Sequence, residues 1–336
     1  MSAGGDHYVD AVTNPDTSPT ASDSGAPAPI RTRVTDLLGV DYPIVQAPMG
    51  WIARSRLAAA VSNAGGLGII ETSSGELDAV RAEIAKMADL TDKPFGVNIA
   101  QAFVRDPGIA QFVIDQGVRF VTTSAGDPTK YTGQLKAAGL TVFHVVPTLA
   151  AALKAVAAGV DGLVVEGGEG GGFKNPRDVA SMVLIPLVAS RVQVPIIAAG
   201  GIADGAGMAA AFALGAQGVQ MGTRMVSAAE SPVHDNWKQA IVQAAETDTV
   251  FLNRFSKPGL RALRTERTAR LERQDHVELS EMSRALELYF GGDMGASIAL
   301  TGQVAGRIDA VLPVRQIIHD TVRQFRERAR ELAELV

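Results

Sequence analysis

The sequence contains no cysteine, which excludes a disulfide framework, a thiolate metal site and a cysteine nucleophile. This absence fits a reducing cytosol, and we expect a cytoplasmic protein. The few histidines are spread too widely to give the spacing of metal ligands: His7, His144, His234, His276 and His319. Neither glycine cluster completes a G-x-G-x-x-G pattern and no G-x-x-x-x-G-K-[ST] motif occurs, so Rossmann and P-loop functions lose support.

Long apolar runs and a basic excess are also missing. The net charge of -5 argues against a nucleic-acid partner. The longest uncharged stretches, 137–153 and 205–223, carry Pro, Gln, His or several Gly, so neither predicts a membrane helix. Residues 1–30 are rich in Ser, Pro, Asp and Gly and lack the apolar core of a secretory signal, which predicts a disordered N-terminal tail.

From about residue 40, short β-branched runs alternate with Ala-rich helical runs. Strands are predicted at 43–46, 68–70, 95–98, 120–122, 141–145, 162–165, 195–198 and 218–221. Helices are predicted near 54–64, 76–89, 105–116, 128–138, 148–158, 179–192 and 204–214. Eight strands with intervening helices predict a (β/α)8 TIM barrel over residues 31–224, with an open doubly wound sheet as the alternative.

The alternation stops after Met221. Residues 225–336 contain helical runs, an Arg-rich stretch and a charged helix near 312–334. No Pro/Ser-rich linker precedes them, so we expect an appended helical subdomain and C-terminal helix packed on the barrel rather than a separate domain.

Glycine, small and polar residues gather where the predicted strands end, the rim at which barrel enzymes carry their chemistry. Three bare-backbone segments stand there: Gly170 to Gly172, Gly200-Gly201 and Gly222-Thr223. The last two follow the seventh and eighth strands, where barrels frequently bind phosphate through backbone amides. We therefore predict a phosphorylated cofactor. Gly65-Gly66, at the opposite rim, indicates a tight turn instead.

Several segments together resemble the nitronate monooxygenase family, once called 2-nitropropane dioxygenases. They are PIVQAPMGWIARSRLAAAVSNAGGLGII, DKPFGVNI, VVEGGEGGG, PIIAAGGIADGAGMAAAFALGAQGVQMGTR and GQVAGRI. The resemblance runs from about Ile30 to the C-terminus. It implies a TIM-barrel flavoprotein that binds FMN across the strand ends. Flavin-dependent enoyl reductases and quinone reductases share that fold.

Carried over by position, the resemblance implies a cofactor role for eleven residues. The flavin ring would be lined by Ala47, Pro48 and Met49, with Asn98 at its polar edge. Glu166 would bind ribityl hydroxyls. The glycine positions implied beside the cofactor and its phosphate, with one threonine, are Gly171, Gly172, Gly200, Gly201, Gly222 and Thr223.

The sequence departs from the family at two positions. Many members have a histidine after this glycine loop, where Phe173 stands here, and a phenyl ring can neither accept nor donate a proton. Another position, often Lys in the family, is Val145. Lys174, Glu169 and His144 are the catalytic candidates that remain nearby. Each has a structural alternative, respectively a solvated loop lysine, a cap of backbone amides and a core histidine.

An arginine recurs every third residue from Arg261 to Arg273, with Lys257 upstream. This stripe is compatible with a phosphate-rich ligand such as coenzyme A, although a solvated helix paired with Glu266 and Glu272 is the simpler interpretation. We expect a small-molecule substrate, with a coenzyme A (CoA) thioester and a homo-oligomer as open options.

The resulting hypothesis is an FMN-dependent oxidoreductase that moves a hydride or electrons to or from a small or acyl-CoA-type substrate. One alternative is a flavin-dependent acyl-CoA, enoyl or quinone oxidoreductase, since some actinobacterial relatives working on steroid fragments look similar in the glycine loop. Two alternatives of other classes are a flavin-free phosphate-binding lyase or isomerase and a non-enzymatic flavin or nucleotide binder.

Overall fold

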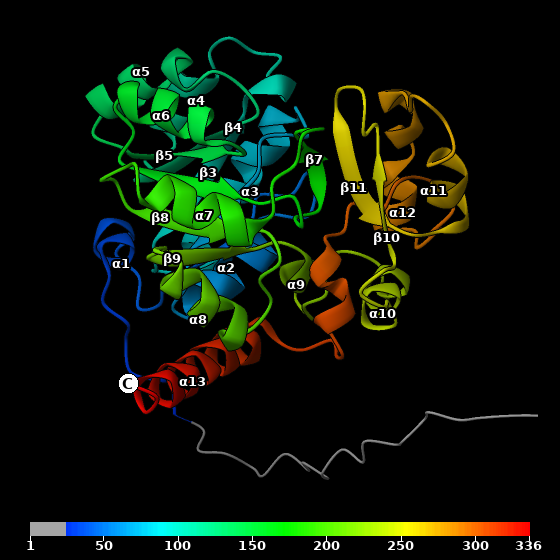
Figure 1. Ribbon diagram of the computed structural model, residues 1–336. Helices are drawn as coiled ribbons and strands as arrows, with labels where there is room; N and C mark the ends of the chain where they lie inside the picture. Colours follow the sequence, from blue (N-terminus) through cyan, green and yellow to red (C-terminus); the bar gives the residue numbers. More distant parts are fainter. Residues whose placement is uncertain (1–24) are drawn as a thin grey trace, which may run out of the picture.

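A barrel of eight parallel strands forms the centre of the protein (Figure 1). The computed structural model describes residues 25–336. Its barrel strands are β1 (Ile44–Gln46), β2 (Gly68–Ile70), β3 (Phe95–Ala100), β4 (Phe120–Ser124), β5 (Thr141–Val146), β6 (Gly162–Glu166), β8 (Ile196–Ala199) and β9 (Gly218–Met221).

The strands lie side by side in the order β1-β9-β8-β6-β5-β4-β3-β2. A parallel bridge between Val45 and Leu67 joins β1 to the chain just before β2, and the Gln46 N–H donates to the Leu67 carbonyl at 3.0 Å. The sheet therefore closes on itself. The predicted (β/α)8 barrel is confirmed and the open doubly wound alternative is wrong.

Eight helices surround the strands. They are α2 (Ser55–Asn63), α3 (Leu77–Leu90), α4 (Ile109–Asp115), α5 (Thr132–Ala137), α6 (Leu149–Ala157), α7 (Ser181–Ala189), α8 (Gly205–Ala213) and α13 (Val314–Ala333). The first seven lie where the sequence predicts them, and α13 packs against α8 and α2. Close contact is possible because a Cβ on Gly205 would lie 2.3 Å from the Phe325 nitrogen.

Large side chains fill the inside of the barrel. Phe120 and Phe143 meet edge to face with ring centroids 5.4 Å apart. The glycine opposite Phe143 makes this possible, because a Cβ on Gly162 would lie 2.3 Å from that ring. Helix α1 (Arg33–Leu38) adds Val34 and Leu38 to the same apolar cluster. The interior is thus a packed core of side chains rather than a pore.

The chain after β9 enters α9 (Thr223–Val226), and the region between α9 and α13, residues 227–313, is called the insertion below. It contains α10 (Asp235–Val242), β10 (Thr249–Leu252), β11 (Gly259–Leu263), α11 (Glu266–Leu271) and α12 (Ala285–Tyr289). Strands β10 and β11 form an antiparallel hairpin, and β7 (Gly172–Lys174), from the glycine loop after β6, pairs with β11.

The expected helical subdomain over 225–336 needs two corrections. Its first part includes the β10–β11 hairpin, which the sequence patterns hid because both strands are short and β11 carries Arg261. Its last part, α13, is the eighth helix of the barrel itself (Figure 1). The insertion therefore leaves the barrel at its mouth and returns to it.

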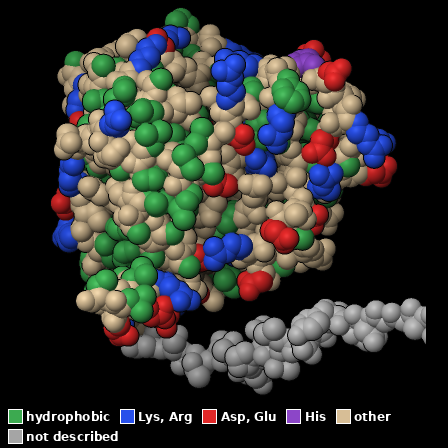
Figure 2. Space-filling view, viewed as in Figure 1, with side chains coloured by type: hydrophobic (Ala, Val, Ile, Leu, Met, Phe, Trp, Pro, Cys, Tyr) green, Lys and Arg blue, Asp and Glu red, His purple; other side chains and the backbone are tan. Residues whose placement is uncertain are grey.

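The predicted tail falls largely outside the described residues, which begin at Gly25. Residues 25–30 form no helix or strand but are fixed to the barrel: the Arg326 guanidinium donates to the Ala28 carbonyl at 2.5 Å, and the Ile30 N–H donates to the Asp41 carbonyl at 2.9 Å. Apolar side chains gather on the outer face of α7, where Met182 is 68% and Val183 57% exposed (Figure 2). Among residues 25–336, no helix combines the length and apolarity needed to cross a membrane.

Candidate functional site

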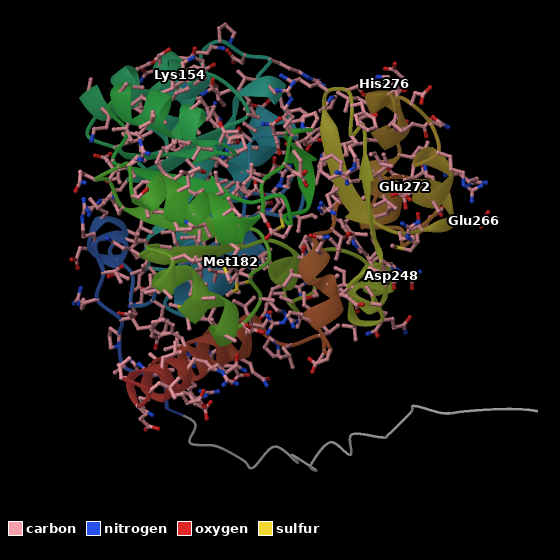
Figure 3. The ribbon with its side chains drawn as sticks, viewed as in Figure 1. Lys154, Met182, Asp248, Glu266, Glu272 and His276 are labelled. Carbon is pink, nitrogen blue, oxygen red and sulfur yellow. The ribbon has the colours of Figure 1, made fainter. Side chains whose placement is uncertain are left out.

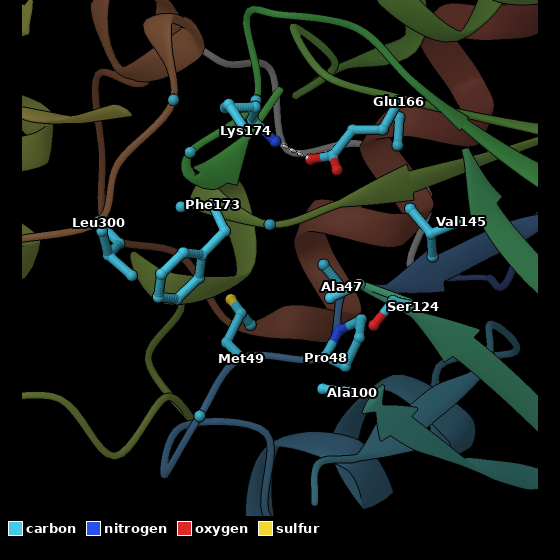
Figure 4. Close-up of a pocket in the computed structure, with 18 of the residues that line it drawn as sticks. Ala47, Pro48, Met49, Ala100, Ser124, Val145, Glu166, Phe173, Lys174 and Leu300 are labelled. Carbon is cyan, nitrogen blue, oxygen red and sulfur yellow. Dashed lines mark hydrogen bonds and ion pairs between the residues drawn. The ribbon is translucent and has the colours of Figure 1, made fainter. Parts of the chain in front are cut away.

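A cavity of about 870 Å³ opens at the carboxyl ends of the barrel strands, between the barrel and the insertion (Figure 4). Its volume lies within the range of small-molecule and cofactor sites. All fourteen site residues predicted from the sequence border it: Ala47, Pro48, Met49, Asn98, His144, Glu166, Glu169, Gly171, Gly172, Lys174, Gly200, Gly201, Gly222 and Thr223. Bordering the cavity does not by itself give each side chain a role, and the contacts separate them.

A cradle of bare backbone follows β8 and β9. Gly200 and Gly201 adopt φ of +93° and +76°, conformations that L side chains rarely reach. A Cβ on Gly200 would also lie 3.0 Å from the Gly167 carbonyl oxygen. The backbone N–H groups of Gly201, Gly222 and Thr223 donate to no protein acceptor in the described part of the chain. Amide donors without a protein partner, on residues that border one cavity, suit an anion.

The cradle continues into the insertion through Gly302. Its N–H donates to Thr223 Oγ1 at 2.9 Å, which leaves the threonine O–H available to a ligand. Gly171 packs against the same segment, because a Cβ on it would lie 2.7 Å from the Gly302 nitrogen. The glycine at 171 therefore allows the loop after β6 to approach the backbone at Gly302 closely, in addition to leaving space for a ligand.

Asn98 lies at the end of β3, 2% exposed. Its Nδ2 donates to Thr122 Oγ1 at 2.9 Å and to the Thr122 carbonyl at 3.2 Å. These bonds fix the amide, and Oδ1 accepts no hydrogen bond from residues 25–336. The side chain therefore presents a positioned acceptor at the cavity.

Glu166 and Lys174 form an ion pair inside the cavity (Figure 4). The lysine side chain is only 5% exposed and the glutamate 26%. Gly170 makes room for the pair, since a Cβ there would lie 2.6 Å from Glu166 Oε1 and 2.8 Å from Lys174 Nζ. The alternative of a solvated loop lysine is wrong, because Lys174 is buried and paired.

The Glu169 carboxylate binds the start of α7. It accepts from the Ser181 N–H at 2.9 Å and from Ser181 Oγ at 2.9 Å. Both bonds cap the first turn of the helix, and the negative charge lies favourably at its N-terminus. This placement supports the structural alternative weighed for Glu169 over the catalytic one.

His144 occupies the middle of β5, and its side chain is directed away from the barrel interior. Strand alternation requires this, because the flanking Phe143 and Val145 belong to the interior cluster. The imidazole Nδ1 lies 2.7 Å from Thr123 Oγ1 on β4. Burial lowers the pKa of His144 to about 4. A neutral, outward-facing ring fits a core histidine better than a catalytic base.

Phe173 lies on β7 with its ring in the cavity, near Met49 and Leu300 (Figure 4). It contacts Phe103 with ring centroids 5.0 Å apart and, like Met282 and Leu300 of the insertion, packs against the buried apolar cluster of β10 and β11. We call these four residues, Phe103, Phe173, Met282 and Leu300, the apolar wall. At the position where the resemblance implies a histidine, this chain therefore presents an apolar surface.

The arginine stripe does not form one surface. Arg261 is buried on β11, where its Nε donates to the Gly168 carbonyl at 2.7 Å and its Nη2 lies 3.4 Å from Asp178 Oδ2. Arg264 and Arg270 pair with Glu272 and Glu266 on the outer side of the insertion (Figure 3). The structure thus supports the paired interpretation over a phosphate-binding stripe.

Two polar groups of the site escaped the sequence patterns. Gln220 on β9 has a buried Oε1 without a hydrogen-bond partner in the described structure, and the residue lines the cavity. Tyr289 lines it from α12, and burial raises the pKa of its phenol. Trp237 lies against this ring at 4.8 Å between centroids. The glutamine at a strand end was a usable signal, whereas the position of Tyr289 depends on the path of the insertion.

Fold and cavity define the class of protein, a (β/α)8-barrel enzyme whose site lies at the carboxyl ends of the strands. The model of the family described as nitronate monooxygenase matches residues 31–107 and 102–324. The chain belongs to this family and is an oxidoreductase, as the sequence motifs predicted.

Similar proteins carry several names. A (3aS,4S,5R,7aS)-5-hydroxy-7a-methyl-1-oxo-octahydro-1H-indene-4-carboxyl-CoA dehydrogenase of Mycobacterium tuberculosis is 42% identical over 247 residues, 72% of this chain and 69% of that one. A nitronate monooxygenase of Paraburkholderia phytofirmans is 34% identical over 64% of this chain and 71% of its own. The solved structure of FabK from Thermotoga maritima matches with a TM-score of 0.86 and 41% identity, over 91% of this chain and all of that chain.

Proposed function

We propose that this oxidoreductase binds FMN and acts on the CoA thioester of a bulky apolar acyl group rather than on a simple nitronate. The observation that carries the proposal is the neighbourhood of Phe173. The apolar wall replaces a proton-transferring side chain, and the paired Lys174 stands beside it.

The residues present fit a flavin phosphate. Free N–H groups at Gly201, Gly222 and Thr223 supply donors for an anion, and a Cβ at Gly200 would crowd the loop that holds them. Thr223 Oγ1 adds a hydroxyl donor. This donor set supports FMN, whose phosphate would lie at the cradle. The large cavity beside the cradle favours FMN over a flavin-free phosphate-binding enzyme, because such an enzyme would not need a cavity of this size for a small phosphorylated substrate.

A bound flavin supplies hydride and electron transfer, while the chain supplies position and charge. Ala47 to Met49 form one border of the cavity, and the fixed Asn98 amide presents an acceptor at another. The unpartnered Oε1 of Gln220 is a second acceptor suited to an imide N–H. These groups would orient the ring and exclude water from its face.

Lys174 is the cavity cation best placed to bind a carbonyl oxygen or a developing negative charge. Glu166 holds its ammonium, and Gly170 leaves the space for both. The amine has three donors, so one ion pair leaves two for a substrate. The phenyl ring of Phe173 would meanwhile contact the apolar body of the acyl group.

The names of relatives support this substrate class. The relative from Mycobacterium tuberculosis is named for a bicyclic carboxyl-CoA substrate. An apolar wall suits fused-ring or long acyl groups, whereas a small nitronate gains little from it.

The test is to purify the protein, release its cofactor by heat and identify that cofactor by chromatography and mass spectrometry. The flavin-loaded protein is then mixed with saturated and unsaturated acyl-CoA thioesters, with NAD(P)H and with propyl nitronate. The proposal expects FMN and faster flavin reduction or reoxidation by an acyl-CoA thioester than by the nitronate. A nitronate preferred by tenfold or more would contradict the substrate, and a colourless protein that takes up no flavin would contradict the cofactor.

A further inference from the structure

The turn between β10 and β11, residues 253–258, is unusual because it presents a phenylalanine to solvent. We call it the hairpin tip. Phe255 is 95% exposed, the most exposed large apolar side chain of residues 25–335. An aromatic side chain left bare in this way carries an unfavourable hydration cost that contact with a ligand would relieve.

The hairpin tip is built as a fixed structure. Asn253, which is 4% exposed, adopts φ of +56°. Its Nδ2 donates to the carbonyls of Pro258 and Val277 at 2.9 Å each, and its Oδ1 accepts from the Val277 N–H at 2.7 Å. The Ser256 N–H donates back to the Asn253 carbonyl at 3.1 Å. The exposed ring therefore stands on a closed and anchored turn.

The hairpin tip also lies at the cavity mouth and carries positive charge. Lys257 and Pro258 line the cavity, and the exposed Phe255, two residues before Lys257, is not part of the lining. Lys257 is exposed and has no ion-pair partner in the described part of the chain. Arg254 lies 4.8 Å over the Phe251 ring and 3.9 Å from Asp178, which Arg261 also neutralises. Lys257 is thus a cation at the mouth that is available to pair with an anion.

We infer that the hairpin tip binds an adenine nucleotide whose reactive end enters the cavity. The base would stack on Phe255, and the phosphates would pair with Lys257 and Arg254. Two molecules carry this chemistry, a CoA thioester and a nicotinamide dinucleotide electron donor. The inference rests on the proposed function, because it assigns the outer end of a molecule that reacts inside.

The experiment is calorimetric titration of the flavin-loaded protein with coenzyme A, adenosine 3′,5′-bisphosphate, NADH and NADPH. Phe255→Ala and Lys257→Ala are compared with two surface controls, Phe290→Ala and Lys86→Ala. We expect at least one nucleotide to bind, about tenfold more weakly to Phe255→Ala and about fivefold more weakly to Lys257→Ala, with the controls unchanged. The nucleotide whose affinity falls in Phe255→Ala identifies the natural ligand of the hairpin tip as a CoA thioester or a nicotinamide dinucleotide. Adenosine 3′,5′-bisphosphate is the nucleotide end of coenzyme A without the thiol arm, so its binding would indicate coenzyme A rather than a dinucleotide.

Equal affinities in wild type and Phe255→Ala, or no nucleotide binding at all, would overturn the inference. It would also be overturned if Phe255→Ala left binding intact and instead dissociated an oligomer in sedimentation velocity, since the ring would then serve a subunit contact. A protein without flavin that still binds a nucleotide through Phe255 would refute the proposed function alone. If coenzyme A is the nucleotide that binds, flavin turnover of acyl-CoA unaffected by Phe255→Ala would refute only the assignment made here; if a dinucleotide binds, unaffected flavin reduction by that dinucleotide would do so.

Discussion

The barrel and the insertion contribute to the cavity in different ways. The barrel offers mostly backbone, as at Gly200 and Gly201, where positive φ and close contacts exclude side chains. The insertion offers mostly side chains, as at Trp237 and Tyr289, whose rings lie 4.8 Å apart. The glycine loop after β6 belongs to both, since it leaves the barrel and pairs with β11 through β7.

This difference separates two tasks. Under the proposed function, the backbone amides would bind what every turnover has in common, the cofactor, and their geometry changes little when side chains change. Side chains of the insertion and of β7 would then determine which substrate fits. Substitutions on the barrel side should therefore alter flavin affinity, and those on the insertion side should alter substrate preference.

The largest effect is expected where the two regions meet, at Lys174. In Lys174→Met, Glu166 keeps a charge inside the cavity without its partner, which costs on the order of 3 kcal/mol of stability. Turnover of the acyl-CoA substrate should fall by roughly a hundredfold. Urea unfolding and steady-state kinetics measure both, and unchanged kinetics would remove Lys174 from the chemistry.

Lys154→Met is the matched control for this ion pair. Lys154 pairs with Asp127 at 2.7 Å on the surface, where both side chains are about half exposed (Figure 3). Because water screens such a pair, the control should lose no measurable stability or activity. Equal losses in the two variants would show that burial of Lys174 has no special consequence.

Gly171→Ala should weaken FMN binding by about tenfold to a hundredfold. The added methyl would lie 2.7 Å from the Gly302 nitrogen, and the displaced segment would take Thr223 with it. Fluorescence titration of the flavin-depleted protein measures the loss. Gly133→Ala, in open space on α5, is the control and should leave FMN affinity intact. Normal affinity in Gly171→Ala would refute the packing account of this loop.

Acid should weaken the barrel through His144. Its pKa is about 4 in the folded protein, below the ordinary value of 6.5, so between these pH values the unfolded chain binds a proton that the folded chain does not. Stability therefore falls as pH drops, by about 2 kcal/mol between pH 7 and pH 5. In His144→Gln this slope should be shallower by that amount, as urea unfolding at both pH values would show. Parallel slopes would contradict it.

The smallest effect is expected at Phe173. Phe173→His restores a group able to transfer a proton, and nitronate oxidation should rise by about tenfold, less than an optimally placed base supplies. Acyl-CoA turnover should fall in the same variant because the apolar wall is interrupted. Flavin affinity should not change, which stopped-flow kinetics and titration together establish. A rise in both activities would mean that Phe173 does not select the substrate.

Local pattern was enough to locate the barrel, because its strands are short apolar runs whose side chains are buried on both faces. Gly68–Ile70 and Gly218–Met221 match their predicted bounds. The C-terminal helix was expected to pack on the barrel, and it does. Its place as the eighth helix of the barrel was missed, because the whole insertion separates α13 from β9 and only tertiary contact with α8 shows that place.

The directions in which the side chains of the site point could not be predicted from the sequence. His144 and Glu166 both lie on strands that reach the mouth, yet alternation directs the first toward the helices and the second into the cavity. Glu169 lies close to Glu166 along the chain but accepts from Ser181. Glycine positions were more informative, because the absence of a Cβ leaves the backbone accessible whatever direction a side chain at that position would take.

The most direct test is calorimetry of the flavin-depleted protein with FMN and with riboflavin, which lacks the phosphate. If the free amides of Gly201, Gly222 and Thr223 hold that phosphate, FMN should bind one to one and at least a hundredfold more tightly than riboflavin. Equal affinities for the two flavins, or binding of neither, would contradict the account.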